Sequence, residues 1–194
     1  MKKLSLLLLL VFLILASVVI YNYVHNVTGN QALAPTSSAG PPARLRVPRL
    51  GVDAPVMSVG QTASGAMDAP TSTAYNSPYW TSVFWYKLGA EPGQAGNVVI
   101  AGHVNRVGGD PAVFWGLGSL QPGDMVSVVM QNGNVINYAV DRVVVYPANY
   151  PGQDAFNAVF GPTTEHHLNL ITCSGVWTGS GYDQRLVVLT TQVN

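Results

Sequence analysis

The chain has 194 residues, which is the usual size of one domain with one core once an N-terminal apolar stretch is set aside. Its formal net charge is +0 and only 9% of its residues are charged, so it lacks the basic surface that nucleic acids attract, and we expect no nucleic-acid partner. The single cysteine, Cys173, excludes an intrachain disulfide, a zinc ribbon and a CxxC redox motif. Cys173 is therefore either an inert core thiol or a nucleophile.

The start of the chain combines positive charge with a long apolar run. Lys2 and Lys3 precede residues 4–24, which carry no charge and, at about 1.5 Å per helical residue, are long enough to cross a bilayer core. Because positive residues stay on the cytoplasmic side, we expect residues 1–24 to be a single-pass signal-anchor transmembrane helix, with the rest of the chain outside the cell membrane. The alternative is a cleaved signal peptide, for which residues 32–34 offer an A-x-A pattern, although it lies further along than such sites usually do.

The segment that follows is small, polar and rich in proline and glycine. Residues 25–43 have too little apolar surface to compensate for the entropy of ordering them. We expect them to form a flexible extracytoplasmic linker. No repeat is visible in residues 44–194, which we predict to be one folded domain.

That domain has the texture of a mainly β protein. Short apolar runs, several of them alternating, recur between turn residues, and Asn132-Gly133 is a strong hairpin signal. The expected strands are Leu45–Val47, Val52–Val56, Val98–Ile100, Met125–Met130, Val135–Val145, Leu168–Thr172 and Leu186–Thr191.

Three other segments are less regular. Residues 79–88 are compatible with a short helix or a strand, and residues 111–120 have apolar side chains at helical spacing after a proline, which indicates one or two helical turns. Residues 146–160 form a long connection, which in a compact domain indicates a functional loop or a small helix within it.

The cysteine stands at the end of an expected strand. Cys173 closes the run 168–173 and opens a loop rich in glycine and serine, and Arg185 begins the next apolar run. If the two strands pair antiparallel, Cys173 and Arg185 lie at the same rim. A guanidinium beside a cysteine favours the thiolate and donates to an oxyanion that forms on an attacked carbonyl. The plain alternative is an arginine that only marks an exposed strand start.

A histidine repeats this placement. His103 follows the apolar run 97–102, again at the end of an expected strand. Histidine is the side chain best suited to pair with a thiolate and then to give a proton to a leaving amine. Two such strand ends together with Arg185 favour a cysteine nucleophile, with Cys173, His103 and Arg185 as the catalytic residues.

These motifs resemble those of the sortase family. Residues 97–124 are similar to the segment in which the catalytic histidine of sortases follows an apolar strand and precedes a phenylalanine, a leucine and a Gly-Asp turn, and residues 169–173 (NLITC) resemble the TLxTC signature. Arg185 lies twelve residues beyond Cys173, a usual distance. The resemblance runs from about residue 44 to residue 194 and points to class D, E or F without separating them. Asn169 departs from the family's threonine.

The resemblance implies a sortase-like, mixed, eight-stranded β-barrel with short helices. It also implies a transpeptidase that cleaves an LPxTG-like C-terminal sorting motif of secreted proteins between Thr and Gly. The acyl group then passes from the enzyme to an amine of a peptidoglycan precursor or of a pilin. Thr172 matches a position that helps to orient the arginine or the bound peptide, and no cofactor or metal is implied.

Other functions stay open at this point. His166 and His167, with Glu165 before them, suggest a metal site shared with Cys173, but neighbouring residues of one strand point to opposite faces. The scattered acidic residues form no evident calcium cluster. An L,D-transpeptidase-like wall enzyme would have a His and a Gly directly before its cysteine, where Ile171 and Thr172 stand here. The last alternative is a membrane-anchored barrel that binds peptides without catalysis.

Overall fold

The computed structural model describes residues 40–149 and 152–193. The expected transmembrane helix, and the expected linker up to residue 39, lie outside the described residues. Within the part that is described, no helix is long and apolar enough to cross a membrane. The first strand begins at Pro42, which belongs to the last residues of the segment expected to be linker.

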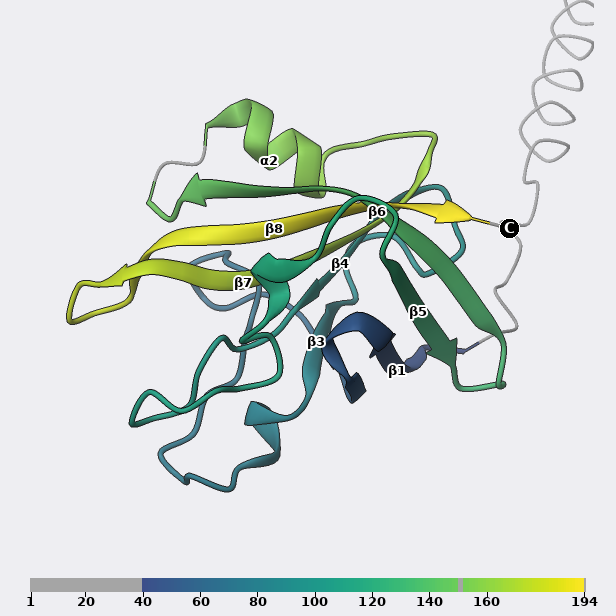
Figure 1. Cartoon of the computed structure of the whole chain (residues 1–194). Coiled ribbons are helices and arrows are strands. Elements are labelled where there is room, and N and C mark those ends of the chain that lie inside the picture. The colour runs from purple at the N-terminus through teal and green to yellow at the C-terminus, as the bar shows by residue number, and fades with distance from the viewer. Residues whose placement is uncertain (1–39, 150–151, 194) are drawn as a thin grey trace, which may run out of the picture. The chain divides into compact units, whose positions relative to one another are not determined.

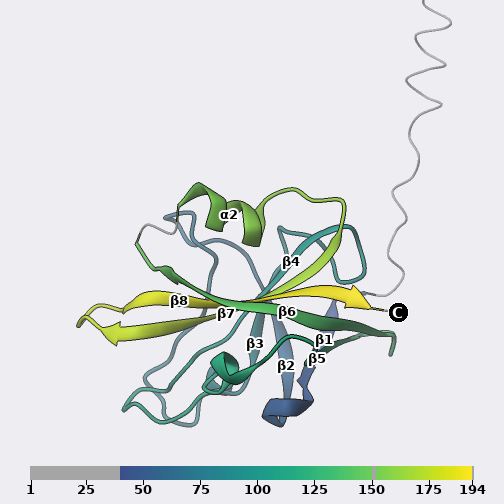
Figure 2. The ribbon, with the colours of Figure 1, turned by 45° about the horizontal axis from the view of Figure 1, so that its top comes forward.

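Eight strands close into one barrel of mixed pairing (Figures 1 and 2). Around the barrel they follow the order β1-β2-β3-β4-β7-β8-β6-β5. The pairs β2–β3 and β4–β7 are parallel and all others are antiparallel. The mixed eight-stranded barrel expected from the resemblance is thus confirmed. The strands are β1 (Pro42–Val47), β2 (Val52–Val59), β3 (Val83–Tyr86), β4 (Gly96–Ala101), β5 (Met125–Met130), β6 (Val135–Pro147), β7 (His166–Trp177) and β8 (Tyr182–Val193).

The helices are few and short, as expected. The irregular segment 79–88 divides into the end of a 3-10 turn and the strand β3, so both interpretations hold for part of it. Residues 111–120 contain one helical turn near their end, and the long connection 146–160 contains a two-turn α-helix. The helices are η1 (Pro48–Leu50), η2 (Pro78–Trp80), η3 (Leu117–Ser119) and α2 (Gln153–Phe160).

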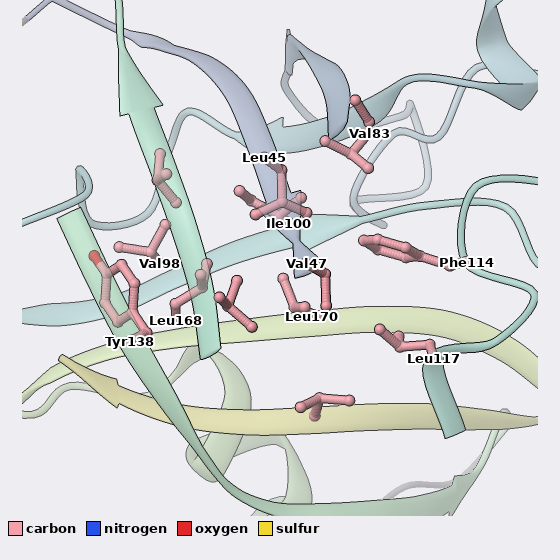
Figure 3. Close-up of a cluster of buried hydrophobic side chains, with 14 of the residues drawn as sticks. Leu45, Val47, Val83, Val98, Ile100, Phe114, Leu117, Tyr138, Leu168 and Leu170 are labelled. Atoms are coloured by element: carbon pink, nitrogen blue, oxygen red, sulfur yellow. The ribbon is translucent and has the colours of Figure 1, made fainter. Parts of the chain in front are cut away.

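The barrel interior is filled by alternate residues of the strands (Figure 3). Leu168 and Leu170 of β7 point inward with Val98 and Ile100 of β4, and all four are fully buried. Tyr138 is the largest fully buried side chain, and burial raises the pKa of its hydroxyl to about 12 even though that oxygen accepts a hydrogen bond from the amide of Gly93 at 3.1 Å. This packed interior makes the barrel a rigid support for its outer face.

The outer face of β4, β7 and β8 carries a second apolar cluster. Val99, Val187 and Leu189 point outward and pack with Val159 of α2, which lies over this side of the barrel in both views (Figures 1 and 2). Because successive side chains of a strand point to opposite faces, these strands have two buried faces, one inside the barrel and one beneath the helix.

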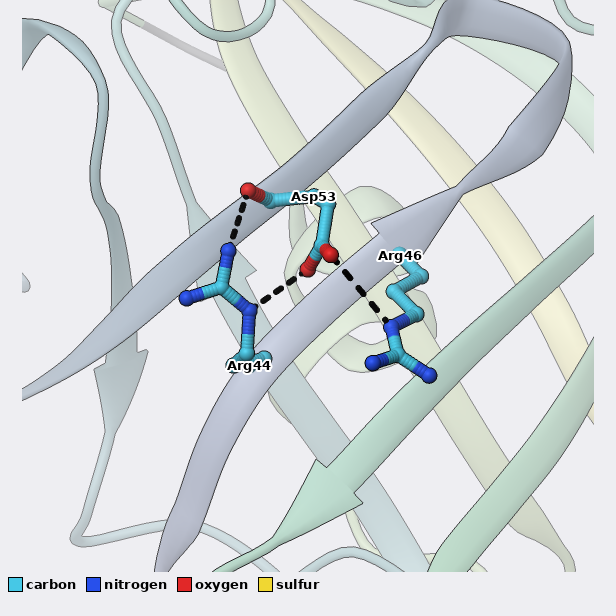
Figure 4. A network of polar contacts seen from close by, with 3 residues as sticks. All are labelled: Arg44, Arg46 and Asp53. Atoms are coloured by element: carbon cyan, nitrogen blue, oxygen red, sulfur yellow. Dashed lines mark hydrogen bonds and ion pairs between the residues drawn. The ribbon is translucent and has the colours of Figure 1, made fainter.

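A small ionic network ties the first two strands together (Figure 4). Asp53 accepts hydrogen bonds from Nε of Arg44 at 2.6 Å and contacts Nε of Arg46 at 3.6 Å, while Nη2 of Arg44 donates to the Asp53 carbonyl at 2.7 Å. The Arg44 guanidinium holds the pKa of the Asp53 carboxyl below its usual value. All three side chains are exposed, so the network adds little to the stability of the fold.

Candidate active site

Cys173 lies on the outer face of β7, at the end where the regular pairing stops. Ile171, two residues earlier, packs into the outer cluster, and the alternation of the strand places Cys173 on the same side. The pairing with β8 shifts register just beyond Ser174, and Gly175 adopts a φ of +83° there. The thiol is half-buried. The sequence therefore presents the sulfur where the strand opens into a hairpin.

Arg185 lies directly opposite this cysteine. The two residues are Cα partners in the antiparallel ladder between β7 and β8, so their side chains leave the sheet on the same face. Nη1 of Arg185 donates to the carbonyl oxygens of Tyr182 at 3.0 Å and Gln184 at 2.8 Å. A guanidinium has five N–H donors, so anchoring through Nη1 is compatible with donation toward the cysteine.

His103 occupies the equivalent position on the other neighbour of β7. The last parallel pair between β4 and β7 joins Ala101 to Ile171, and the amide of Gly102 donates to the Ile171 carbonyl at 3.0 Å. His103 follows Ala101 by two residues, and Cys173 follows Ile171 by two residues. The histidine, the cysteine and the arginine thus follow one another across three adjacent segments, and all three line one groove.

Close packing just before His103 explains the glycine at position 102. A Cβ added to Gly102 would lie 2.5 Å from a ring carbon of Phe114, which is fully buried. The amide of Phe114 in turn donates to the His103 carbonyl at 3.0 Å. The Gly-His pair is therefore fixed against the barrel by one ring and one backbone hydrogen bond.

The groove over these residues has a volume of about 1530 Å³. Cys173 and Val187 belong to its floor, which the outer faces of β7 and β8 provide. One wall is α2, which contributes Phe156 and Phe160. The other wall is made by the connection 60–82 and the segment 103–111.

Two buried amides hold the α2 wall on the sheet. Nδ2 of Asn169 donates to Oδ1 of Asn97 at 2.9 Å and to the carbonyl of Val159 at 3.0 Å. Nδ2 of Asn97 donates to the carbonyl of Gly161 at 2.7 Å. The carbonyls at the end of a helix have no partner within it, so these amides complete the C-terminus of α2. Asn169, which stands where sortases prefer threonine, has this local role.

The opposite wall consists of two segments that contact each other near the surface. Tyr75 of the connection 60–82 contacts Arg106 and Asp110 of the segment 103–111, and we call these three residues the latch. The hydroxyl of Tyr75 donates to Oδ2 of Asp110 at 2.9 Å, and Nη1 of Arg106 donates to the Tyr75 carbonyl at 3.2 Å. The guanidinium of Arg106 also lies 5.2 Å from the centre of the Tyr75 ring. The hydrogen bond and the charge of Asp110 raise the pKa of Tyr75 above its ordinary value.

A model of the sortase domain matches residues 45–193, which is most of the chain and includes the three residues described above. The chain belongs to the sortase family. Sortases are cysteine transpeptidases, and the chain is thus assigned to this class of enzyme.

Solved sortase structures share the fold at low sequence identity. Sortase A of Corynebacterium diphtheriae matches with a TM-score of 0.58 at 18% identity over 87% of this chain and 68% of that one. Sortase C-1 of Actinomyces oris matches with 0.57 at 21% identity over 78% of this chain and 71% of that one. Streptococcus agalactiae sortase C1, in complex with MTSET, matches with 0.57 at 20% identity over 78% of this chain, which spans 66% of that protein's chain. A search of curated proteins gave no match.

Thr172 was expected to help orient the arginine or a bound peptide. Its side chain is buried, unlike that of the neighbouring Cys173. Its hydroxyl donates to the Gly102 carbonyl at 2.9 Å and the residue is 5% exposed. It lines the groove in this sortase, but its polar atom bridges β7 to the residue before His103. The position therefore fixes the spacing between the histidine and the cysteine.

Three contacts that surround His103 have no signal in the sequence. Its Nε2 lies 2.8 Å from the carbonyl oxygen of Pro70, and its ring makes edge contacts with Trp80 and Phe84 at centroid distances of 4.9 and 5.4 Å. Pro70 lies in a segment without periodicity, and a backbone carbonyl has no residue type. The aromatic residues of the run 79–88 can be identified in the sequence, but their contact with His103 cannot.

The rival metal site is not assembled. His166 and His167 pair with the first residues of β4, whereas Cys173 lies near the far end of the same strand. Nδ1 of His167 contacts the Thr190 carbonyl and the Thr191 hydroxyl, both at 3.2 Å. Within residues 40–149 and 152–193, no three His, Cys, Asp or Glu side chains gather as metal ligands would.

Proposed function

We propose that this sortase cleaves an LPxTG-like C-terminal sorting motif between Thr and Gly and transfers the acyl group to an amine of the cell wall or of a pilin. The observation that carries the proposal is the arrangement of three side chains on one groove. Cys173 and Arg185 are paired opposite each other, and His103 lies two residues beyond the end of β4, on the other side of β7.

The chemistry follows from this arrangement. The sulfur of Cys173 attacks the Thr carbonyl, His103 supplies a proton to the leaving Gly amine, and a thioester remains on the enzyme. Arg185 donates to the oxygen that becomes negative during each attack. A second amine then attacks the thioester and releases Cys173.

The walls of the groove support a peptide substrate with apolar side chains. Phe160 stacks on Phe156 at 5.4 Å and packs edge-on against Tyr86 at 5.9 Å, and Met67 lies against the same cluster. This surface suits the Leu and Pro side chains of the proposed motif, because burial of apolar area drives their binding. Phe156 is 52% exposed, which leaves room for a ligand to cover it.

We further propose that the enzyme is anchored in the cell membrane by residues 1–24, with its barrel on the outer side. The support is the sequence alone: an uncharged apolar run preceded by Lys2 and Lys3. In this position the enzyme meets secreted proteins as they leave the membrane. The amine donor would be a peptidoglycan precursor or a pilin lysine.

The proposal is tested by mass spectrometry of the full chain in detergent micelles after incubation with a library of sorting peptides. We expect a mass increase equal to the acyl part of one peptide, located on Cys173, and release of the C-terminal fragment. The matched control is Cys173→Ala, which removes the sulfur and should give neither product.

Each other result identifies an alternative. Peptide binding without an acyl-enzyme would indicate a binding module and would refute the transpeptidase. An acyl-enzyme formed only with peptidoglycan stem peptides would indicate a wall enzyme of the L,D-transpeptidase kind.

A further inference from the structure

A polar contact of the His103 ring determines which of its two nitrogens carries a hydrogen. Its Nε2 lies 2.8 Å from the carbonyl oxygen of Pro70, and a carbonyl oxygen only accepts hydrogen bonds. The ring nitrogen must therefore be the donor, so Nε2 carries a hydrogen as long as this contact exists. The nitrogen that remains free to gain or lose a proton is Nδ1.

Two aromatic rings limit the rotation of the same imidazole. Trp80 and Phe84 approach it edge-on, with interplanar angles of 61° and 73°, and their own exposures are 3% and 0%. The indole N–H of Trp80 donates to the carbonyl of Ala74 at 2.8 Å, so this ring is tied to the segment that carries Pro70. The imidazole is thus restrained by two rings and a carbonyl.

The segment that carries Pro70 is itself fastened to the segment that follows His103. The latch makes this connection through the Tyr75 hydroxyl and the Arg106 guanidinium. Arg106 also donates through Nε to the Pro111 carbonyl at 3.2 Å, and its amide donates to the Asp110 carbonyl at 2.7 Å. The carbonyl of Pro70 and the histidine therefore belong to two segments that the latch holds in one arrangement.

We propose that the Pro70 carbonyl, held in place by the latch, positions His103 with Nε2 protonated, so that Nδ1 is the atom that exchanges protons with Cys173 and with the amines. This inference rests on the proposed transpeptidase function and adds the atom that performs the proton transfer. Pro70, Tyr75, Arg106 and Asp110 are positioning residues in this scheme.

The proton transfers balance through Nδ1 alone. The thiol proton passes to Nδ1, the sulfur bonds to the peptide carbonyl carbon, and the C–N bond breaks as Nδ1–H protonates the leaving amine. The incoming amine then loses a proton to Nδ1 as it attacks the thioester, the C–S bond breaks, and Nδ1–H returns the proton to the thiolate. Throughout, Nε2–H stays donated to Pro70, and this bond strengthens while the ring is an imidazolium.

The first test is nitrogen NMR of the full chain in micelles, with the imidazole nitrogens labelled and His103 assigned by the variant His103→Gln. We expect neutral His103 to be a single tautomer with hydrogen on Nε2, and this N–H to be protected from exchange with water. A hydrogen on Nδ1, or rapid averaging of the two tautomers, overturns the proposal. The spectrum needs no substrate, so it decides the proposal even if no sorting peptide is cleaved.

The second test removes the latch with Tyr75→Phe combined with Arg106→Gln. We expect His103 to lose its protected Nε2–H and kcat to fall by about tenfold with KM little changed, a part of the roughly 10²–10⁴-fold that acid–base catalysis contributes. The matched control is Ser64→Ala, an exposed change in the same connection, which should keep the protected proton and the wild-type rate. An unchanged kcat overturns the role of the latch, and an increased kcat shows instead that this segment obstructs the site.

Discussion

The two walls of the groove are built on opposite physical principles. The α2 wall is attached by Asn97 and Asn169, which are 8% and 1% exposed and satisfy the last carbonyls of the helix. The opposite wall is attached largely by the latch at the surface, and the buried Trp80 ring joins it to His103 and to the Ala74 carbonyl. One wall is part of the folded core, and the other is held at the surface.

This difference predicts different consequences when a contact is lost. A buried amide left without its partner destabilises the whole domain, since the desolvated group finds no replacement in water. An exposed hydrogen bond or ion pair is exchanged for water at little cost. Changes in the α2 wall should therefore affect unfolding and peptide binding, and changes in the latch should affect the histidine.

The largest loss of activity should come from a change in the floor of the groove, and the effects of changes in the two walls are compared with it. We expect Arg185→Ala to lower kcat by about 10²–10³-fold with little change in KM, because the loss is of a donor to the developing oxyanion. Steady-state cleavage of a fluorogenic sorting peptide measures both constants. The control is Arg142→Ala, an exposed arginine of β6, which should keep its activity. An equal loss in KM and in rate would assign Arg185 to substrate binding.

The α2 wall is tested next by Asn169→Ala. This change leaves the Val159 carbonyl and the Asn97 side chain without a donor, so we expect the free energy of unfolding to fall by about 1–3 kcal/mol per unsatisfied group. Hydrogen exchange of α2 should accelerate and KM for the peptide should rise, with less change in kcat. Chemical denaturation and exchange mass spectrometry measure these effects.

The matched control for this wall is Asn134→Ala, an exposed asparagine in the β5–β6 turn. It should unfold like the unchanged protein. If Asn169→Ala also unfolds like the unchanged protein, the comparison of the two walls fails, because the buried amides would then contribute nothing that water cannot replace.

An intermediate effect on stability and turnover is expected at Gly102, where the segment that carries His103 packs against the core. In Gly102→Ala the new Cβ would contact the buried Phe114 ring, and such overpacking costs about 1–3 kcal/mol. Because Phe114 also binds the His103 carbonyl, we expect the turnover number to fall together with stability. Gly116→Ala is the control, since its Cβ would meet Leu50 at an ordinary 3.4 Å. Equal stability of the two variants would show that the Phe114 ring moves freely.

The sequence predicted the parts of this molecule that depend on residue type and on the alternation of strands. Cys173, His103 and Arg185 are identifiable because each follows or opens an apolar run, and the barrel pairing then brings these positions together. The α2 helix was predicted only as one of two alternatives for the long connection 146–160, since eight residues give a weak periodic signal.

The sequence failed where contacts depend on tertiary structure. The bond from His103 to Pro70 joins positions 33 residues apart through a backbone atom, and the bond between Asn169 and Asn97 joins positions 72 residues apart. Neither has a local pattern, because the closed barrel brings Asn97 beside Asn169 and the latch holds the Pro70 segment beside His103. The motif comparison marked Asn169 as a departure without indicating its partner.

The smallest effect should be the response of the latch to pH. The neutral hydroxyl of Tyr75 is the donor to Asp110, and this contact raises the pKa of Tyr75, so the bond is complete below about pH 10 and is lost as the pH rises through the raised value. In Asp110→Asn the negative charge is gone, and Tyr75 should ionise at lower pH. An ultraviolet titration of the tyrosines against the unchanged protein should show one phenolate that forms earlier.

The control for this titration is Asp154→Asn on the exposed side of α2, which should leave the curve unchanged. Stability near neutral pH should differ little among the three proteins, because Tyr75 and Asp110 are exposed and their contact is exchanged for water. A large loss of stability in Asp110→Asn would instead place the latch in the same class as the buried amides. The two walls would then share one principle, and the histidine would be held by the fold itself.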